Sequence, residues 1–122
     1  MIDNKFRKPR IWSNEELQKF SHDVKGKIVN VSGWKDIDKQ GKRYREYFSQ
    51  AQEYWITNYI SEARGFQGNL ENEIFLDLSK PLAKELHGQF DVVFNHTVLE
   101  HIFEVDIAFE NICLLSNDLV II

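Results

Sequence analysis

The sequence predicts an α/β fold, a doubly wound parallel sheet of five strands with helices on both faces. Short apolar runs of strand length alternate with helical patterns along the chain, which is the signature of repeated β-α units. The run 90–94 is almost wholly apolar, as in a strand buried on both faces, and it turns polar at 95–97. Right-handed crossovers between such units favour the strand order 3-2-1-4-5.

Length and composition describe an ordinary globular chain. It has 122 residues, of which 43% are hydrophobic and 28% charged, enough for one domain with a modest core. No apolar run approaches the roughly 20 residues that a membrane helix needs, and the N-terminus lacks the apolar segment of a secretory signal. The single cysteine, Cys113, excludes an internal disulfide. We therefore expect a cytoplasmic protein without membrane contact.

Charge is distributed unevenly along the chain. Residues 1–50 carry 12 Lys/Arg and 7 Asp/Glu, whereas residues 51–122 carry 3 and 12. This asymmetry favours either an anionic partner or a solvated basic face. Because no dense basic tract with interleaved aromatic residues is present, nucleic acid is an unlikely partner.

The first 25 residues are expected to form an N-terminal arm and helix, and residues 26–122 the core. Ser13 and Glu16 have capping-box spacing, which predicts a helix from Ser13 to about His22. Leu17 and Phe20 would lie on its inner face.

The first two strands are expected at 27–31 and 53–59, the second from its aromatic and β-branched content. Between them, a helix over 42–48 would turn three aromatic side chains inward: Tyr44, Tyr47 and Phe48. The same segment carries five cations that either receive an anionic substrate or form a solvated face: Lys35, Lys39, Lys42, Arg43 and Arg45.

The second half of the chain continues the alternation. We expect strands at 73–78, 90–95 and 119–122, a short helix at 81–87 stopped by Gly88, and a helix over 104–116. Within 90–95, we expect Asp91 to be the exception to burial. The last helix carries an apolar stripe that includes the cysteine: Val105, Ala108, Phe109, Ile112 and Cys113.

The stretch around the fourth strand also resembles a known family. Phe-Asp-Val-Val at 90–93, followed by Val-Leu-Glu-His at 98–101, is similar to the fourth strand and following turn of class I S-adenosylmethionine-dependent methyltransferases, and more narrowly of the small-molecule type 11 group. The resemblance covers roughly 27–122 and implies a Rossmann-like core that lacks the family's last two strands. It implies that strand five is covered by further chain or by a second copy in a homo-oligomer.

The resemblance also implies where a cofactor would bind. In open α/β sheets, ligands bind at the carboxyl ends of the strands, where the strand order reverses. By analogy, the backbone around Gly33 would face the methionine part of S-adenosylmethionine, Asn58 the ribose, with Glu62 as a fallback, and Asp77 the adenine. The residues expected around this cleft are Ser32, Gly33, Trp34, Asn58, Tyr59, Asp77, Leu78, Asn95, His96 and Thr97.

The turn after strand one departs from the family, whose members carry several glycines there. Here only Gly33 remains, between Ser32 and Trp34. The indole of Trp34 would either close over the ligand or fill the space that the ligand needs. Asp77 likewise has two compatible roles, since it can also cap the helix that is expected to follow it.

Methyl transfer asks for alignment of the reacting atoms and exclusion of water, and a hydroxyl acceptor also needs a base. His101 and His96 are the candidates for that base, although His101 could instead fix the turn by a hydrogen bond. Their five-residue spacing does not suit a helical zinc pair, so we expect no metal. Gly-x-Ser-x-Gly and P-loop motifs are absent from the sequence.

Two functions therefore compete. The first is S-adenosylmethionine-dependent methyl transfer to a small polar molecule, such as a sugar or another metabolite. The second is a non-catalytic binding or scaffold protein that kept the fold. A nicotinamide-binding domain is less well supported, because Gly-x-Gly-x-x-Gly does not follow strand one.

Overall fold

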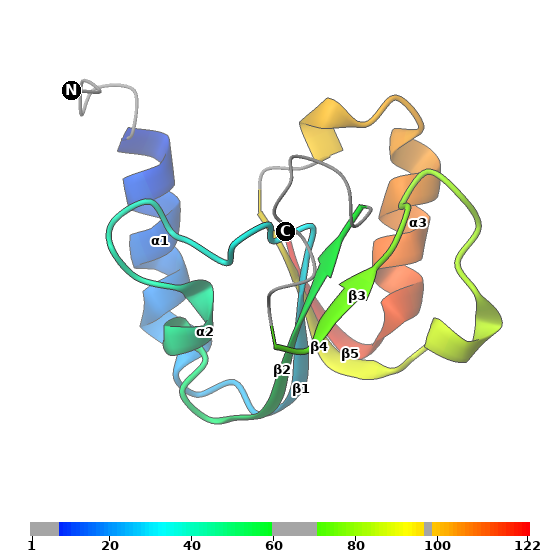
Figure 1. The fold of residues 1–122 in the computed structure, drawn as a ribbon. Helices are drawn as coiled ribbons and strands as arrows, with labels where there is room; N and C mark the ends of the chain where they lie inside the picture. The colour runs from blue at the N-terminus through cyan, green and yellow to red at the C-terminus, as the bar shows by residue number, and fades with distance from the viewer. Residues whose placement is uncertain (1–7, 60–70, 97–98) are drawn as a thin grey trace.

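The computed structural model describes residues 8–59, 71–96 and 99–122. Five parallel strands form one sheet in the order β3-β2-β1-β4-β5, as predicted. Helices α1 and α2 lie on one face of the sheet and α3 on the other (Figure 1). The elements are α1 Lys8–Ser21, β1 Gly26–Val31, α2 Tyr44–Tyr47, β2 Ala51–Asn58, β3 Glu73–Phe75, a 3-10 turn Lys84–Leu86, β4 Phe90–Asn95, a 3-10 turn Leu99–His101, α3 Val105–Leu115 and β5 Ser116–Ile121.

The core has two halves, one on each face of the sheet. Because side chains alternate along a strand, Ile28 of β1 packs toward α1 and α2, while Val29 packs toward α3. The predicted aromatic trio of the α2 region is buried on the first face, with Tyr44, Tyr47 and Phe48 each at most 5% exposed. The cores on both faces therefore bury the central strands β1 and β4.

The prediction for β4 is confirmed. Five of its six residues are buried, and Asp91 is the exception. Asp91 Oδ2 accepts a hydrogen bond from the backbone N–H of Lys27 at 2.8 Å, and this bond is the main reason that the pKa of Asp91 lies below its usual value. Gly26 supports the contact, because a Cβ at that position would collide with the Asp91 carboxylate. The Asp91 side chain thus connects the start of β4 to the start of β1.

The first helix differs from its prediction. It begins at Lys8, so Ser13 lies inside the helix and its hydroxyl donates to the carbonyl of Arg10. The predicted capping box is therefore wrong. Leu17 is buried as expected, but Phe20 is 43% exposed. The buried residues of the helix are Asn14, Leu17 and Ser21. Two of the three are polar, so hydrogen bonds as well as apolar contacts hold the helix against the rest of the protein, and the hydrophobic pattern alone did not predict its buried face.

Two predictions in the second half are also wrong. Segment 81–87 forms only the 3-10 turn Lys84–Leu86, and the predicted stripe of α3 is only partly buried, because Val105, Phe109 and Cys113 are exposed. The buried face of α3 also carries a polar residue, Asn111. Its side chain donates to the carbonyls of Leu78 and Lys80 and accepts from the N–H of Leu82. These bonds attach segment 78–82 to the inward face of α3.

A buried carboxylate organises the loop between β1 and α2. Asp36 is fully buried. Its Oδ1 accepts from Asn30 Nδ2 at 2.8 Å and from Tyr54 Oη at 2.7 Å, and its Oδ2 accepts from the N–H of Arg45 at 3.0 Å. Burial and the nearby Asp36 charge raise the pKa of Tyr54 well above its usual value. One carboxylate thus connects β1, β2 and α2.

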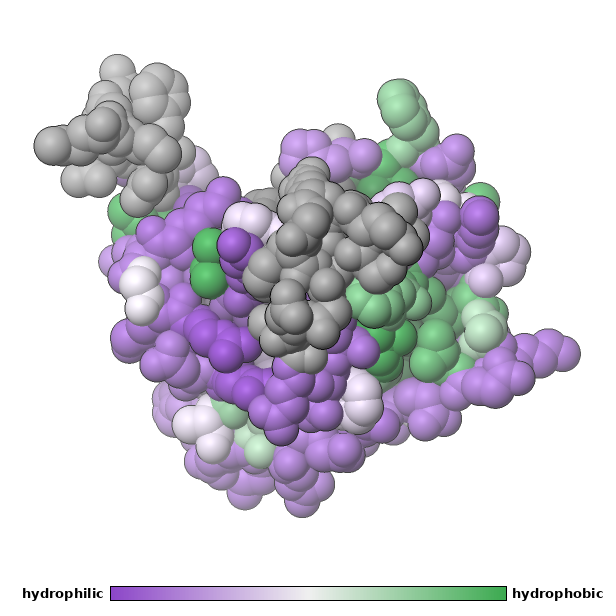
Figure 2. All heavy atoms as spheres, in the orientation of Figure 1, coloured by the Kyte–Doolittle hydropathy of each residue, from purple (hydrophilic) through white to green (hydrophobic). Residues whose placement is uncertain are grey.

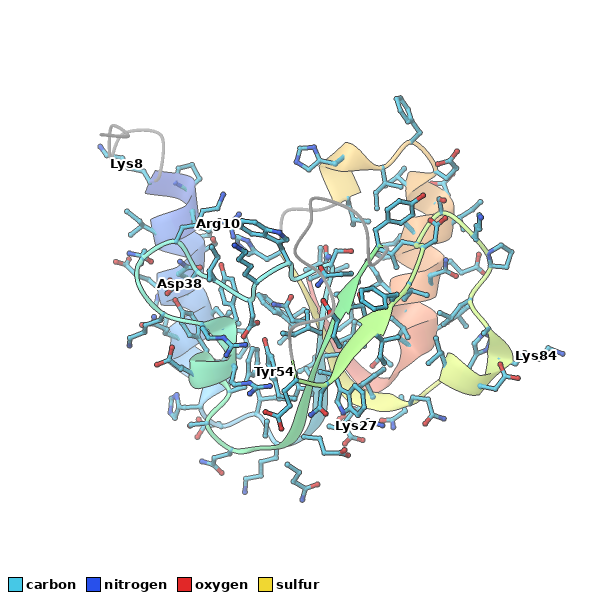
Figure 3. All side chains as sticks on the ribbon, viewed as in Figure 1. Lys8, Arg10, Lys27, Asp38, Tyr54 and Lys84 are labelled. Carbon is cyan, nitrogen blue, oxygen red and sulfur yellow. The ribbon has the colours of Figure 1, made fainter. Side chains whose placement is uncertain are left out.

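Asp38 ties the same loop to the two helices. Its carboxylate accepts from the N–H groups of Gln40 and Lys42 and from Tyr47 Oη at 2.6 Å. Burial raises the pKa of Asp38, but these hydrogen bonds outweigh that effect and the pKa lies below its usual value. Asn14 of α1 donates to the Asp38 carbonyl. Figure 3 shows Asp38 beside α1, and Tyr54 packs in the core on the α1 and α2 face of the sheet.

No helix among the described residues is long and apolar enough to cross a membrane. The cytoplasmic location and the division at residues 25 and 26 stay predictions.

We predict that Val93→Asp prevents folding. Val93 has no exposed surface, and an unpaired buried charge costs about 3–5 kcal/mol or more, a large part of the roughly 5–15 kcal/mol that stabilises a domain. Thermal unfolding followed by circular dichroism measures this effect. Gln52→Asp, which places the same charge at an exposed position of β2, is the control. A Val93→Asp variant that melts like wild type would contradict the assigned core.

We also predict an acid-sensitive contribution from Asp38. Because its folded pKa is depressed, its ionised form stabilises the fold above the usual pKa of about 3.9, and this contribution is lost as pH falls through the folded value. Asp38→Asn should therefore lower the free energy of unfolding at neutral pH, and the difference from wild type should shrink below about pH 4. Denaturant titrations at several pH values measure it, with the exposed Asp118→Asn as control. A difference that does not change with pH would refute the assignment.

Candidate functional site

A cavity of about 700 Å³ lies at the carboxyl edge of the sheet. Nine of the predicted site residues line it: Ser32, Gly33, Trp34, Asn58, Tyr59, Asp77, Leu78, His96 and His101. Asn95 is not part of the lining, because it is 1% exposed and its side-chain amide donates to the carbonyl of Val31. Thr97 and Glu62 lie outside the described residues.

The turn after β1 is anchored on the end of β2. The backbone N–H of Ser32 donates to Thr57 Oγ1, and that of Gly33 donates to the Thr57 carbonyl. The N–H of Trp34 donates to Asn58 Oδ1 at 2.8 Å. These three backbone N–H groups therefore already donate hydrogen bonds to other residues of the protein. A glycine-rich turn would be expected to direct such groups toward a ligand, so this turn works differently.

Asn58 holds the backbone of Trp34 from both sides. Besides accepting from the Trp34 N–H, its amide nitrogen donates to the Trp34 carbonyl at 3.1 Å and to the Glu73 carboxylate. Asn58 is 5% exposed but still reaches the cavity wall. Its main structural role is thus to position Trp34, and the predicted contact with a ribose stays a prediction.

The one glycine of the turn is required by packing beneath it. A Cβ on Gly33 would lie 2.6 Å from Asn30 Nδ2 and 2.7 Å from Asn30 Cγ, well inside van der Waals contact. Asn30 cannot move away easily, because the same nitrogen donates to Asp36. Gly33 therefore lets the turn close over the buried Asn30–Asp36 pair.

Trp34 forms a wall of the cavity. Its φ of 51° is in the left-handed region, and Ser32 has a similar φ of 53°, a conformation that non-glycine residues adopt at some cost. The ammonium of Lys35 lies 4.9 Å from the centre of the indole ring, a cation–π contact. Tyr59, 56% exposed at the end of β2, also lines the cavity.

On the β3 side, the cavity combines apolar walls with one carboxylate. Leu76, Leu78 and Ile102 supply the apolar surface. Asp77 Oδ1 accepts from both the N–H and the hydroxyl of Ser79, and these bonds hold the pKa of the Asp77 carboxyl below its usual value. The carboxylate is therefore ionised at neutral pH and organises the turn after β3, but the helix that Asp77 was expected to cap does not form there.

Two histidines reach the cavity from the segment after β4. His96 Nε2 is hydrogen-bonded to Ser13 Oγ of α1 at 2.7 Å, and its ring packs against Tyr44 and Phe94 with centroids 5.9 and 6.1 Å away. His101 belongs to the 3-10 turn Leu99–His101 and is exposed. His96 is thus fixed in position, whereas His101 lies at the open edge.

A polar wall of the cavity comes from α1, β1, α2 and the loop between β1 and α2, and of its residues the sequence prediction had offered only Lys39, as a cation for an anionic substrate. Arg10, Asn30, Lys39 and Tyr44 all line the cavity. Arg10 was assigned to the N-terminal arm because the helix was expected to begin at Ser13. The i, i+3, i+4 and i+7 spacing of Arg10, Ser13, Asn14 and Leu17 was a usable signal, but three of these residues are polar.

Comparison with known proteins supports the fold. No family model and no curated protein matches the sequence. A solved structure does match: the crystal structure of the trans-methyltransferase CalH in complex with SAH, with a TM-score of 0.51 and 18% sequence identity. The match covers 95% of this chain and 38% of CalH. The chain therefore shares the α/β fold of a methyltransferase while spanning well under half the length of that protein.

Proposed function

We propose that this chain binds S-adenosylmethionine and transfers its methyl group to a small polar molecule. The observation that carries the proposal is the cavity at the carboxyl ends of β1, β2, β3 and β4, where doubly wound folds bind ligands. Its volume of about 700 Å³ is in the range for small-molecule and cofactor sites. The fold shared with the SAH complex of CalH agrees with it.

The lining residues suit an adenosyl group. Leu76, Leu78 and Ile102 offer apolar surface for a flat ring, and the Asp77 carboxylate is an acceptor for the adenine amino group. The indole of Trp34 would cover the ligand from the side of β1. When bound, S-adenosylmethionine supplies an activated methyl group, and these residues orient it and exclude water.

The histidines would act on the methyl acceptor. His101 is exposed at the cavity edge and is suited to accept a proton from an acceptor hydroxyl. His96 is fixed by Ser13, so its better role is to position the acceptor. A cytoplasmic setting fits this function.

A non-catalytic binding protein is the second candidate, and one observation favours it. The N–H groups of Ser32, Gly33 and Trp34 all donate to the end of β2, so the turn does not present them to a cofactor. If the indole of Trp34 also fills the cofactor space, the fold would serve another ligand or partner.

We predict that Trp34→Gly weakens SAH binding about tenfold, or about 1.4 kcal/mol, because the variant removes a wall of the cavity. The backbone should accept glycine readily at the positive φ of Trp34. Isothermal titration calorimetry measures the affinity, with Trp12→Ala, an exposed tryptophan on α1, as control. Tighter binding by Trp34→Gly would support the non-catalytic candidate, and no binding by either protein would end the proposal.

We further predict that Asp77→Asn weakens SAH binding about tenfold, because a hydrogen bond to a charged acceptor is worth about 1.5–3 kcal/mol. The amide oxygen can still accept from Ser79, so the turn should be preserved. Asp118→Asn, an exposed carboxylate of β5, is the matched control. An affinity equal to wild type would remove Asp77 from the adenine site.

A further inference from the structure

We propose that the molecule methylated at this site carries an anionic group, a carboxylate or a phosphate, and that Arg10 and Lys39 bind it. This inference rests on the proposed function, because it concerns the methyl acceptor. It adds a substrate class and two binding residues that lie outside the expected cofactor positions.

Arg10 is held at the cavity wall by its neighbours. It lies on α1, and Figure 3 shows it on the side of the helix that faces the sheet. Its Nη1 donates to Tyr44 Oη at 3.1 Å. Both residues line the cavity. A guanidinium fixed in this way loses little further freedom when it binds a planar carboxylate or a phosphate.

Of the five cations between residues 35 and 45, three have a charged or aromatic partner and Lys42 lies outside the cavity lining. Arg43 lies 3.8 Å from the Asp36 carboxylate, Arg45 lies 3.6 Å from that of Glu71, and Lys35 lies over the Trp34 ring. Lys39 lines the cavity and has no ion pair within the described parts of the chain. Of the five cations that the sequence offered, the structure thus brings Lys39 to the site.

Neutral hydrogen-bonding groups accompany these two charges. Tyr44 Oη donates to Asn14 Oδ1 at 2.7 Å, which fixes the ring and the hydroxyl beside Arg10. Burial raises the pKa of Tyr44 above its usual value although Arg10 lowers it, so the hydroxyl stays neutral at physiological pH. His96 lies against the Tyr44 ring. Tyr44 therefore places no negative charge beside Arg10 that would compete with an anionic ligand.

The positive and negative side chains that line the cavity come from different elements of the fold. Arg10 and Lys39 come from α1 and the loop before α2, on one face of the sheet, whereas Glu104 precedes α3 on the other and Asp77 follows β3. Figure 2 shows hydrophilic surface over the α1 and α2 side and hydrophobic side chains gathered toward α3. An anionic acceptor is attracted to the first side and repelled by the carboxylates on the second, which orients it.

The test uses inorganic phosphate and benzoate as probes, with neutral benzamide as the uncharged counterpart of benzoate. Binding to the chain is measured by NMR titration, with and without saturating SAH. The double variant Arg10→Gln/Lys39→Gln is compared with Lys42→Gln/Lys84→Gln, which removes the same charge at exposed positions outside the cavity lining. Arg10→Lys keeps the charge at the first site, and melting temperatures verify that each variant folds.

We expect at least one of the two anions to bind wild type, with the stronger probe identifying the source of the negative charge. We expect benzamide to bind at least tenfold more weakly than benzoate if benzoate is the stronger probe. The Arg10→Gln/Lys39→Gln variant should lose at least tenfold in anion affinity and change its SAH affinity less than twofold, and the control variant should keep both affinities.

Anion binding that is absent in wild type, or that the double variant retains, would overturn the anionic site while SAH binding leaves the proposed function standing. Wild type that fails to bind SAH would instead overturn the proposed function, and with it the acceptor role of Arg10 and Lys39.

Discussion

The candidate site depends on the buried carboxylate of Asp36. It accepts hydrogen bonds from β1 through Asn30, from β2 through Tyr54 and from the backbone of Arg45 in α2. Burying a charge without such partners would cost several kcal/mol. The three donors therefore force the loop after β1 into one path.

That path determines where Trp34 lies. The Asn30 amide that donates to Asp36 also lies directly under Gly33, which has no room for a Cβ. The turn closes over this pair, and Asn58 then fixes the backbone of Trp34 from the end of β2. A series of contacts thus connects the buried carboxylate of Asp36 to the wall of the cavity. The backbone N–H groups of the turn donate hydrogen bonds within this series.

The polar face of α1 forms another wall of the site, and it too is held in place by hydrogen bonds of buried polar side chains. Asn14, 1% exposed, uses its amide on the Asp38 carbonyl, the Gln40 side chain and the Tyr44 hydroxyl. Ser13 reaches His96 from one turn of the same helix. A helix attached by directional hydrogen bonds keeps its register more strictly than one held by apolar contacts, since buried polar groups are costly when unpaired. Arg10 gains its position at the cavity from that register.

The sequence predicted correctly the elements that bury apolar side chains, and it failed for the elements that bury polar side chains. The sheet order, the buried strand around Val93 and the inward aromatic side chains of the α2 region follow hydrophobic patterns, and the structure has them. The predictions for α1 and for segment 81–87 failed next to Asn14 and Asn111, two buried residues whose side chains satisfy backbone groups from distant parts of the chain. No local pattern reveals such partners, so Arg10 could not be assigned to the site from the sequence, whereas Lys39 was among the five cations considered for an anionic substrate.

The most direct test of the account is a crystal structure of the chain with SAH. The account predicts the ligand in the cavity at the carboxyl ends of β1 to β4, with the adenine amino group within hydrogen-bonding distance of Asp77 and the indole of Trp34 against the ligand. SAH bound elsewhere on the chain, or a cavity that the Trp34 ring fills while the ligand is absent at saturating concentration, would contradict it.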